Sequence, residues 1–158
     1  MLNERTRRYL LTAVQGTPVV LEALLQGITE DEADRRPDPE RFTIREAVAH
    51  LADWEPIWRE RLTAIAEKEH PHLPGYDEGQ FAIDHDYAHS IVAEQAAIFA
   101  SERAQLAAYL REIPEEVWGK TGVHGEMGEI TFTELVTLLL AHDGYHLKQI
   151  AEYRQAAG

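Results

Sequence analysis

The sequence predicts an all-α protein folded as a four-helix bundle. Four long segments place apolar residues at intervals of three and four, which is the period of one helix face. No segment alternates apolar and polar residues over enough positions to predict a half-buried strand. A chain of 158 residues can bury one sizeable core without disulfides, so we expect a single domain spanning residues 1–158.

The first helix is expected from about Leu2 to Gln26. Its core face follows intervals of four and three: Leu10, Val14, Thr17, Leu21, Leu24 and Ile28. Pro18 predicts a kink or a displaced boundary, because proline lacks an amide hydrogen and its ring meets the preceding turn. Gly27 favours an end to the helix there, and a loop is expected through Arg36–Pro39.

A capping box at Thr43–Glu46 predicts the start of the second helix, which is expected from Ile44 to about Lys68. One broad face of this helix carries Ala47, His50, Leu51, Trp54, Ile57, Trp58, Leu62 and Ile65. Pro56 is expected to bend it. From His70 to about Asp84 the chain is rich in Pro and Gly, which predicts a long loop of the kind that often borders a functional site.

The third helix is expected to begin at Asp86 or Ser90 and to end before Pro114. Its apolar positions are Ile91, Val92, Ile98, Phe99, Leu106, Tyr109, Leu110 and Ile113, with Gln95 on the same face. After a short turn, the four glycines of residues 119–128 suit either a mobile loop or a small hairpin.

A second capping box, Thr131–Glu134, predicts the start of the last helix, which is expected to run to about Gln155. Its core-facing seam alternates by four and three: Leu135, Leu139, His142, His146, Gln149 and Tyr153. Two histidines therefore lie on the seam that faces the bundle core.

Composition excludes several classes of function. With 28 acidic against 15 basic residues, the formal charge is −13, which repels nucleic-acid backbones. The apolar stretches are too short to span a membrane, and residues 1–20 do not resemble a signal peptide, so we expect a soluble cytoplasmic protein. The chain has no cysteine, so the available metal ligands are His, Asp and Glu.

His142 and His146 form the strongest candidate for a metal site. Side chains four residues apart on a helix project from one face, so both imidazoles can reach one ion. Two buried imidazoles side by side would otherwise have facing lone pairs, and a shared cation solves this problem. His50 lies on the core face of the second helix and could supply a third ligand if the second and last helices are neighbours. Three histidines with an open position are typical of catalytic sites.

Simpler roles remain open for each of these residues. A lone buried histidine is more often hydrogen-bonded core than ligand. Chance placement of eight histidines gives on the order of 0.4 pairs at this spacing, and His85 with His89 is a second such pair. The cluster of His70, His72, His85 and His89, beside two aspartates, is expected to be solvated surface.

For the residues near the proposed site, too, we consider a structural role and a functional role. Gln149 follows His146 by three residues on the same seam and could orient a ligand histidine or a metal-bound water by hydrogen bonding to it. Trp54 is expected to pack in the core or to line a pocket. Asp53 and Glu55 are expected to be charges on the helix surface, and Asp143 lies about 100° around the helix from its histidine neighbour.

The sequence resembles the DinB-like (DinB/YfiT) superfamily of metalloenzymes. The resemblance rests on His50 within Ala49–Glu55, on the terminal segment His142–Ile150, and on the helix pattern over nearly the whole chain. It implies an up-down-down-up bundle, often a homodimer, in which His50, His142 and His146 hold a divalent metal ion. Imidazole ligands suit several metals, and zinc or nickel is expected first, with iron and copper as alternatives.

The resemblance also implies a reaction. Relatives in this superfamily include thiol-dependent S-transferases and a mycothiol-dependent isomerase. We therefore expect a metal-dependent S-transferase that joins a low-molecular-weight thiol to a small electrophile. A metal-dependent hydrolase and a noncatalytic stress-response or binding protein are the alternatives.

Overall fold

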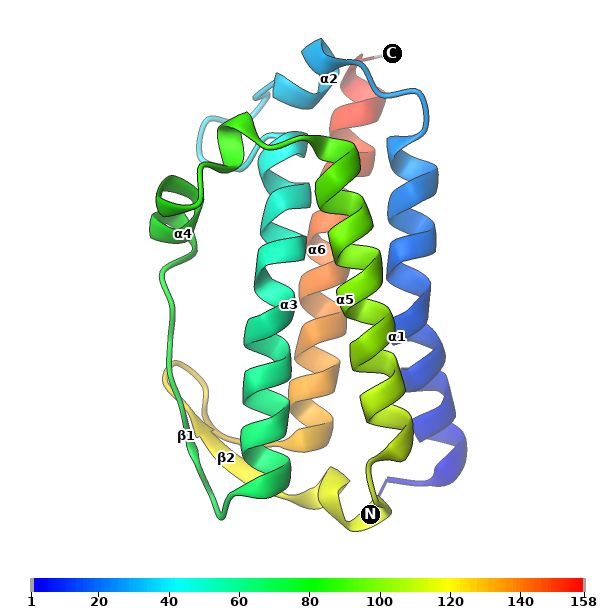
Figure 1. Ribbon diagram of the computed structural model, residues 1–158, viewed down its shortest axis with the longest axis vertical. Coiled ribbons are helices and arrows are strands. Elements are labelled where there is room, and N and C mark those ends of the chain that lie inside the picture. The colour runs from blue at the N-terminus through cyan, green and yellow to red at the C-terminus, as the bar shows by residue number, and fades with distance from the viewer. Residues whose placement is uncertain (1, 158) are drawn as a thin grey trace.

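The computed structural model describes residues 2–157, and within them four long helices form the predicted bundle. These helices are α1 (Glu4–Leu25), α3 (Ile44–Glu67), α5 (Val92–Glu112) and α6 (Phe132–Ala157). Figure 1 shows α1 and α6 rising from the lower end of the molecule, while α3 and α5 run downward. The all-α class and the up-down-down-up topology are both confirmed.

Each helix of the bundle contacts two neighbours. Helix α3 packs against α5 and α6, and α1 packs against the same two helices. Helices α3 and α6 are therefore adjacent, which is the condition for His50 to meet the histidines of α6. Two apolar clusters fill the interior, one around Leu62 and Leu135 and the other around Leu51 and Ile150. Between them, near the middle of the bundle, lie buried polar side chains.

Helix α1 continues through Pro18, so of the two effects predicted for this residue, a kink or a displaced boundary, the displaced boundary is wrong. A proline leaves the carbonyl four residues earlier without its helical donor. That carbonyl belongs to Val14, and the guanidinium of Arg103 donates to it from Nη1 at 3.2 Å. The bundle thus supplies the hydrogen bond that Pro18 removes. A short helix, α2 (Glu30–Asp34), lies in the segment expected to be loop, and its capping box joins Thr29 and Glu32.

Helix α3 begins and ends within one residue of its predicted bounds, and the capping box of Thr43 and Glu46 is present. The long loop expected after it contains β1 (His72–Leu73), α4 (Glu78–Asp84) and a 3₁₀ turn, η1 (Tyr87–His89). The side chain of Asp77 caps α4 by accepting the amide of Gln80. Helix α5 begins at Val92, two residues beyond the later of the two predicted starts, and Ile98 is exposed rather than core-facing.

The glycine-rich segment forms the small hairpin that was one of its two predicted states. After the 3₁₀ turn η2 (Glu115–Gly119), strand β2 (Thr121–His124) pairs antiparallel with β3 (Gly128–Thr131). Strand β1 adds to β2 in parallel, so that Leu73 lies opposite His124. A side chain at Gly122 would come within 3.0 Å of the Pro71 carbonyl, so this position favours glycine.

The sheet lies at the lower end of the bundle in Figure 1, and the segment with α4 climbs along the outside of α3. The carboxylate of Glu134 accepts the amide of Thr131 at 2.8 Å, as the predicted capping box at the start of α6 requires. Within the described residues, no helix combines the length and the hydropathy needed to cross a membrane.

Candidate metal centre

Three histidines from two helices that are distant in sequence meet in the middle of the bundle. His50 comes from α3, and His142 and His146 come from successive turns of α6. One ring nitrogen from each lies within 4.8 Å of the other two. The Nε2 atoms of His50 and His142 are 2.8 Å apart. His50 is fully buried and His146 is 4 % exposed, whereas 14 % of the His142 side chain is exposed.

The hydrogen bonds of Gln149 determine which nitrogen of His146 faces the other two rings. The amide group of Gln149 donates to the Phe42 carbonyl at 2.5 Å, because a carbonyl can only accept. The amide oxygen of Gln149 then faces His146 Nδ1 at 3.2 Å, so Nδ1 carries the proton. The Nε2 lone pair of His146 is left free. These contacts of Gln149 hold the His146 ring in one orientation.

All three rings are held in their neutral form. Burial lowers the pKa of His50 to about 2, and the neighbouring His142 and His146 add to this shift. Burial also lowers the pKa of His142 to about 3 and that of His146 to about 4. Neutral imidazoles keep lone pairs available at neutral pH, which metal binding requires.

The hydrogen bonding of His50 and His142 fits a shared cation. With neutral rings and no ion, one Nε2 must donate to the other, which uses the lone pair of the acceptor. The Nδ1 atoms of both rings are buried and have no hydrogen-bond partner among residues 2–157. A cation between the rings would accept both Nε2 lone pairs once each ring carries its proton on Nδ1. The donor set and its protonation thus suit a divalent metal ion.

Glu78, on α4, is a candidate that the sequence did not reveal. Its Oε1 atom lies 3.9 Å from Nε2 of His50 and 4.0 Å from Nε2 of His142. Burial raises the pKa of Glu78, and the nearby Glu126 raises it further. The residue lies in a segment without helical periodicity in the sequence, so no pattern links it to the histidines. It adds a carboxylate to the histidine cluster.

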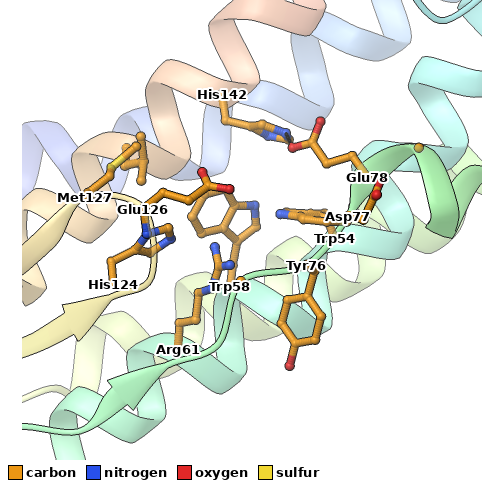
Figure 2. A pocket seen from close by; sticks show the side chains of 13 residues that line it. Trp54, Trp58, Arg61, Tyr76, Asp77, Glu78, His124, Glu126, Met127 and His142 are labelled. Atoms are coloured by element: carbon orange, nitrogen blue, oxygen red, sulfur yellow. Dashed lines mark hydrogen bonds and ion pairs between the residues drawn. The ribbon is translucent and has the colours of Figure 1, made fainter.

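A cavity of about 760 Å³ adjoins this cluster. Figure 2 shows His142 and Glu78 on the upper side of the cavity, with Trp54 and Trp58 behind it. The other lining side chains include Arg61, Tyr76, His124, Glu126, Met127 and Leu138. Trp54 also packs on His50, with 4.9 Å between ring centroids. Trp54 is thus a buried residue that also lines this cavity.

The four remaining predicted histidines do not form a common site in the described structure. His70 contacts Thr121, His85 contacts Asp53, and His89 contacts the adjacent Asp86. His72 and His89 are exposed. The separate contacts of these four histidines agree with their expected position on the protein surface.

Glu55 is not the surface charge that the sequence predicted. Glu55 and Asp143 are both 2 % exposed, and both accept hydrogen bonds from the buried guanidinium of Arg103 at distances from 2.6 to 3.2 Å. Thr17 donates to Asp143 at 2.6 Å. Asp53 is partly buried and accepts the Tyr87 hydroxyl. A single amphipathic profile could not reveal these contacts, because each partner lies on a different helix.

Comparison with known proteins agrees with the fold. A protein of Oceanobacillus iheyensis named "putative metal-dependent hydrolase" is 24% identical over 140 residues, which cover 89% of this chain and 81% of that protein. The structure of YfiT from Bacillus subtilis superposes with a TM-score of 0.93 at 19% identity. It covers 100% of this chain and 91% of its own, and is described as "a probable metal-dependent hydrolase with an unusual four-helix bundle topology".

The family itself follows from a match along most of the sequence. The sequence profile of the DinB superfamily matches residues 5–150, a span that contains the three clustered histidines and all four long helices except the first residue of α1 and the end of α6. The protein is thus a member of the DinB superfamily.

Proposed function

We propose that the protein is a metal-dependent enzyme that acts on an electrophilic small molecule. The observation that carries this proposal is the convergence of three neutral imidazoles beside a cavity. His50, His142 and His146 would hold a divalent ion, and zinc, nickel and iron all suit this donor set. A divalent ion in that place would supply Lewis-acid chemistry, lowering the pKa of water or of a thiol toward neutrality.

The residues of the chain have separate tasks in this scheme. Glu78 lies about one water molecule away from two of the histidine nitrogens and can accept a proton from the attacking nucleophile. Gln149 holds the His146 ring in one tautomer and one orientation. The indole rings of Trp54 and Trp58 form an apolar wall that limits the access of bulk water.

Two reactions remain candidates, and different observations favour them. Hydrolysis is favoured by Glu78, which can serve as general base for water, and by the hydrolase names of the two similar proteins. S-transfer from a low-molecular-weight thiol is favoured by the size of the cavity, which has room for a second substrate beside His142. The chain has no cysteine of its own, so the thiol would have to come from solution.

Metal analysis tests the centre first. Protein purified without an affinity column for histidine tags should contain about one divalent ion per chain by mass spectrometry. His50→Ala, His142→Ala and His146→Ala should each lose it, while the exposed control His89→Ala should retain it. A triple histidine variant with full metal content would refute the centre.

The reaction is tested with the metal-loaded protein. Activated esters and electrophilic halides are assayed with and without bacillithiol, mycothiol or glutathione. Turnover without thiol would identify a hydrolase, and turnover only with thiol would identify an S-transferase. Glu78→Gln should keep the metal and lower turnover by about 10²- to 10⁴-fold, as expected for loss of a general base. A metal-loaded protein without turnover in either assay would favour a binding protein.

A further inference from the structure

Arg61 is a buried cation without an ion pair among residues 2–157, at the side of the cavity opposite His142 in Figure 2. It is 5 % exposed, and its Nε atom is buried without a hydrogen-bond partner among the described residues. One amino group, Nη2, donates to the Pro74 carbonyl at 3.0 Å. Glu60, Glu78 and Glu126 lie close enough to act on its charge, but none of them forms an ion pair with it in residues 2–157.

Two aromatic rings hold the guanidinium in place. Its central carbon lies 5.7 Å from the Trp58 ring and 5.8 Å from the Tyr76 ring. A side chain fixed in this way loses little conformational entropy when it binds a ligand. Burial lowers the pKa of Arg61, but an arginine stays charged at neutral pH. An arginine that is buried, charged and without a carboxylate partner is unusual and calls for an anion.

His124 presents a second unpaired donor on the same cavity. Its Nδ1 atom accepts the backbone amide of Glu126 at 3.2 Å, so the neutral ring carries its proton on Nε2. This Nε2 atom is buried without a partner among the described residues, and His124 is 4 % exposed. Burial and the charge of Arg61 lower the pKa of His124, so the ring adds a neutral N–H donor.

The positions of His50 and Arg61 on α3 give the distance between the two ends of the proposed binding site. His50, Trp54, Trp58 and Arg61 follow one another by four, four and three residues, so they share one face of the helix. Eleven residues separate His50 from Arg61, which is about 16 Å along a helix axis. A ligand along this stripe would meet the histidine cluster first, then the two indole rings, and finally the guanidinium.

We propose that Arg61 and His124 bind the carboxylate of an elongated small-molecule substrate whose reacting atom lies at the histidine cluster. This inference rests on the proposed function for the position of the reacting end. A carboxylate suits the subsite because its two oxygens match two unpaired donors, while the subsite has only one positive charge. A phosphate dianion would also face Glu78 and Glu126 across the same cavity.

A family of probes with one thiol and one variable end tests the inference. Thiolates bind divalent ions coordinated by histidine. The zinc-loaded protein is titrated with ω-mercaptoalkanoic acids of three to eight carbons and with ω-mercapto alcohols of equal length. At the best length, the acid should bind about 10- to 100-fold more tightly than the alcohol, as for a hydrogen bond to a charged group. The readout is the dissociation constant of the alcohol divided by that of the acid.

Variants of Arg61 and His124 separate recognition of the carboxylate from effects that change the affinity for acids and alcohols alike. Arg61→Met should reduce the ratio to about one and leave the affinity for the alcohol unchanged, and His124→Phe should reduce the ratio in part. Arg59→Met is the matched control, since Arg59 lies on the same helix and pairs with Glu102, and it should keep the ratio of the unaltered protein. If Arg61 served only to anchor the Pro74 loop, Arg61→Met would weaken acid and alcohol together.

A second measurement does not depend on the metal. Hexanoate is titrated into the metal-free protein, and the indole N–H signals of Trp54, Trp58 and Trp118 are followed by NMR. Trp118 is buried outside the cavity and serves as reference. The Trp58 signal should shift in the unaltered protein and not in Arg61→Met.

The outcomes distinguish the two proposals. Equal affinity of acids and alcohols would overturn the carboxylate subsite while the metal centre stands, as would tighter binding of ω-mercaptoalkyl phosphates than of the acids. Protein that retains no zinc but shows the hexanoate shift would overturn the metal centre and support the subsite. Absence of the shift in the unaltered protein would overturn the subsite in either case.

Discussion

Two groups of buried polar side chains lie next to each other in the middle of this bundle, and they differ in how fully they are hydrogen-bonded. In the first group, Arg103 uses all five of its N–H donors, on Glu55, Asp143 and the Val14 carbonyl. In the second, the histidine cluster leaves Nδ1 of both His50 and His142 without a partner among the described residues.

The difference separates a structural role from a functional one. Burial opposes the charge of Arg103, but its hydrogen bonds with Asp143 and Glu55 raise its pKa. Burial raises the pKa of Glu55, and the hydrogen bonds from Arg103 oppose this shift. The histidines are held neutral, and without an ion one Nε2 of the His50–His142 pair must donate to the other. A fully bonded cluster joins α1, α3, α5 and α6, whereas the histidine cluster brings together Nε2 atoms that a cation can share. The Arg103 cluster also fixes α6 one residue from His142, through Asp143.

The largest expected effect comes from breaking the Arg103 cluster. Arg103→Met leaves two carboxylates buried without their cation, which should lower the free energy of unfolding by about 3–5 kcal/mol. Urea denaturation of the metal-free protein measures this loss. Arg111→Met, an exposed change on the same helix, should cost less than about 0.5 kcal/mol. A loss below about 1 kcal/mol for Arg103→Met would show that the cluster does not stabilise the bundle.

The stability of the metal-free protein should depend on pH through the histidine cluster. Because the folded protein lowers the pKa of these histidines below 6.5, the unfolded chain binds protons first as the pH falls. Stability is therefore fully present above about pH 6.5 and is lost toward pH 4. Well inside this window, each histidine that protonates on unfolding contributes about 1.4 kcal/mol per pH unit.

The urea concentrations at the midpoint of unfolding, at pH 7.5 and at pH 5.5, measure how the stability of the metal-free protein depends on pH. The exposed control His89→Ala should show the same slope as the unaltered protein. Equal stability at both pH values would contradict the neutral state of the cluster. With metal bound, acidification over the same range should release the ion, because protons compete for the ligand nitrogens.

A smaller effect is expected from Thr17→Val, which keeps the shape of the side chain and removes its hydroxyl. Thr17 donates to the buried carboxylate of Asp143, and a hydrogen bond to a charged group contributes about 1.5–3 kcal/mol. Thr12→Val, exposed on the same helix, is the matched control. The melting temperature of Thr17→Val should be lower than that of Thr12→Val. Equal melting temperatures would show that only the ion pairs of the cluster contribute to stability.

Gln149→Leu tests the orientation of one histidine. The change removes the acceptor of His146 Nδ1, and loss of such an outer partner typically weakens metal affinity by about 10- to 100-fold. Competition with a chromophoric chelator measures the affinity. Gln155→Leu, exposed on the same helix, should leave it unchanged. Unaltered affinity in Gln149→Leu would show that packing alone orients the ring.

The smallest expected effect is on the stability of the metal-free protein when His50 is replaced by leucine. His50→Leu removes a buried polar ring that is incompletely bonded, so the free energy of unfolding should change by less than about 1 kcal/mol or rise. The same variant should not retain the metal. A loss as large as that of Arg103→Met would mean that the two polar groups have the same structural role.

The long helices could be predicted from the sequence because their signals are local. Capping boxes and periods of three and four place the starts of α3 and α6 within one residue. The shorter elements were missed or left open. Helix α4 and strand β1 have too few residues for a periodic pattern, and they are held by contacts with α3 and with the hairpin.

The residues of the candidate site also fall into those that local spacing predicts and those that it does not. His142, His146 and Gln149 share one helix, so their spacing already predicts that they lie on one face. Glu78, Arg61 and His124 were missed, although Arg61 continues the interval pattern of His50, Trp54 and Trp58 along α3. A sequence cannot show whether a charge on a helix is paired, since its partner lies on another element. The misassignment of Glu55 has this cause, because its partner Arg103 is 48 residues away.

The sequence by itself therefore determined the class of fold, the four long helices and two of the three clustered histidines, because short-range spacing encodes each of these. Only the tertiary structure decided that α3 and α6 are neighbours, which brings His50 to the other two rings. It also decided that Arg103 uses all its N–H donors, whereas Arg61 leaves Nε without a partner in the described part of the chain. The physical reason is that burial and hydrogen bonding are properties of packed elements, and local sequence periodicity carries no information about which elements pack together.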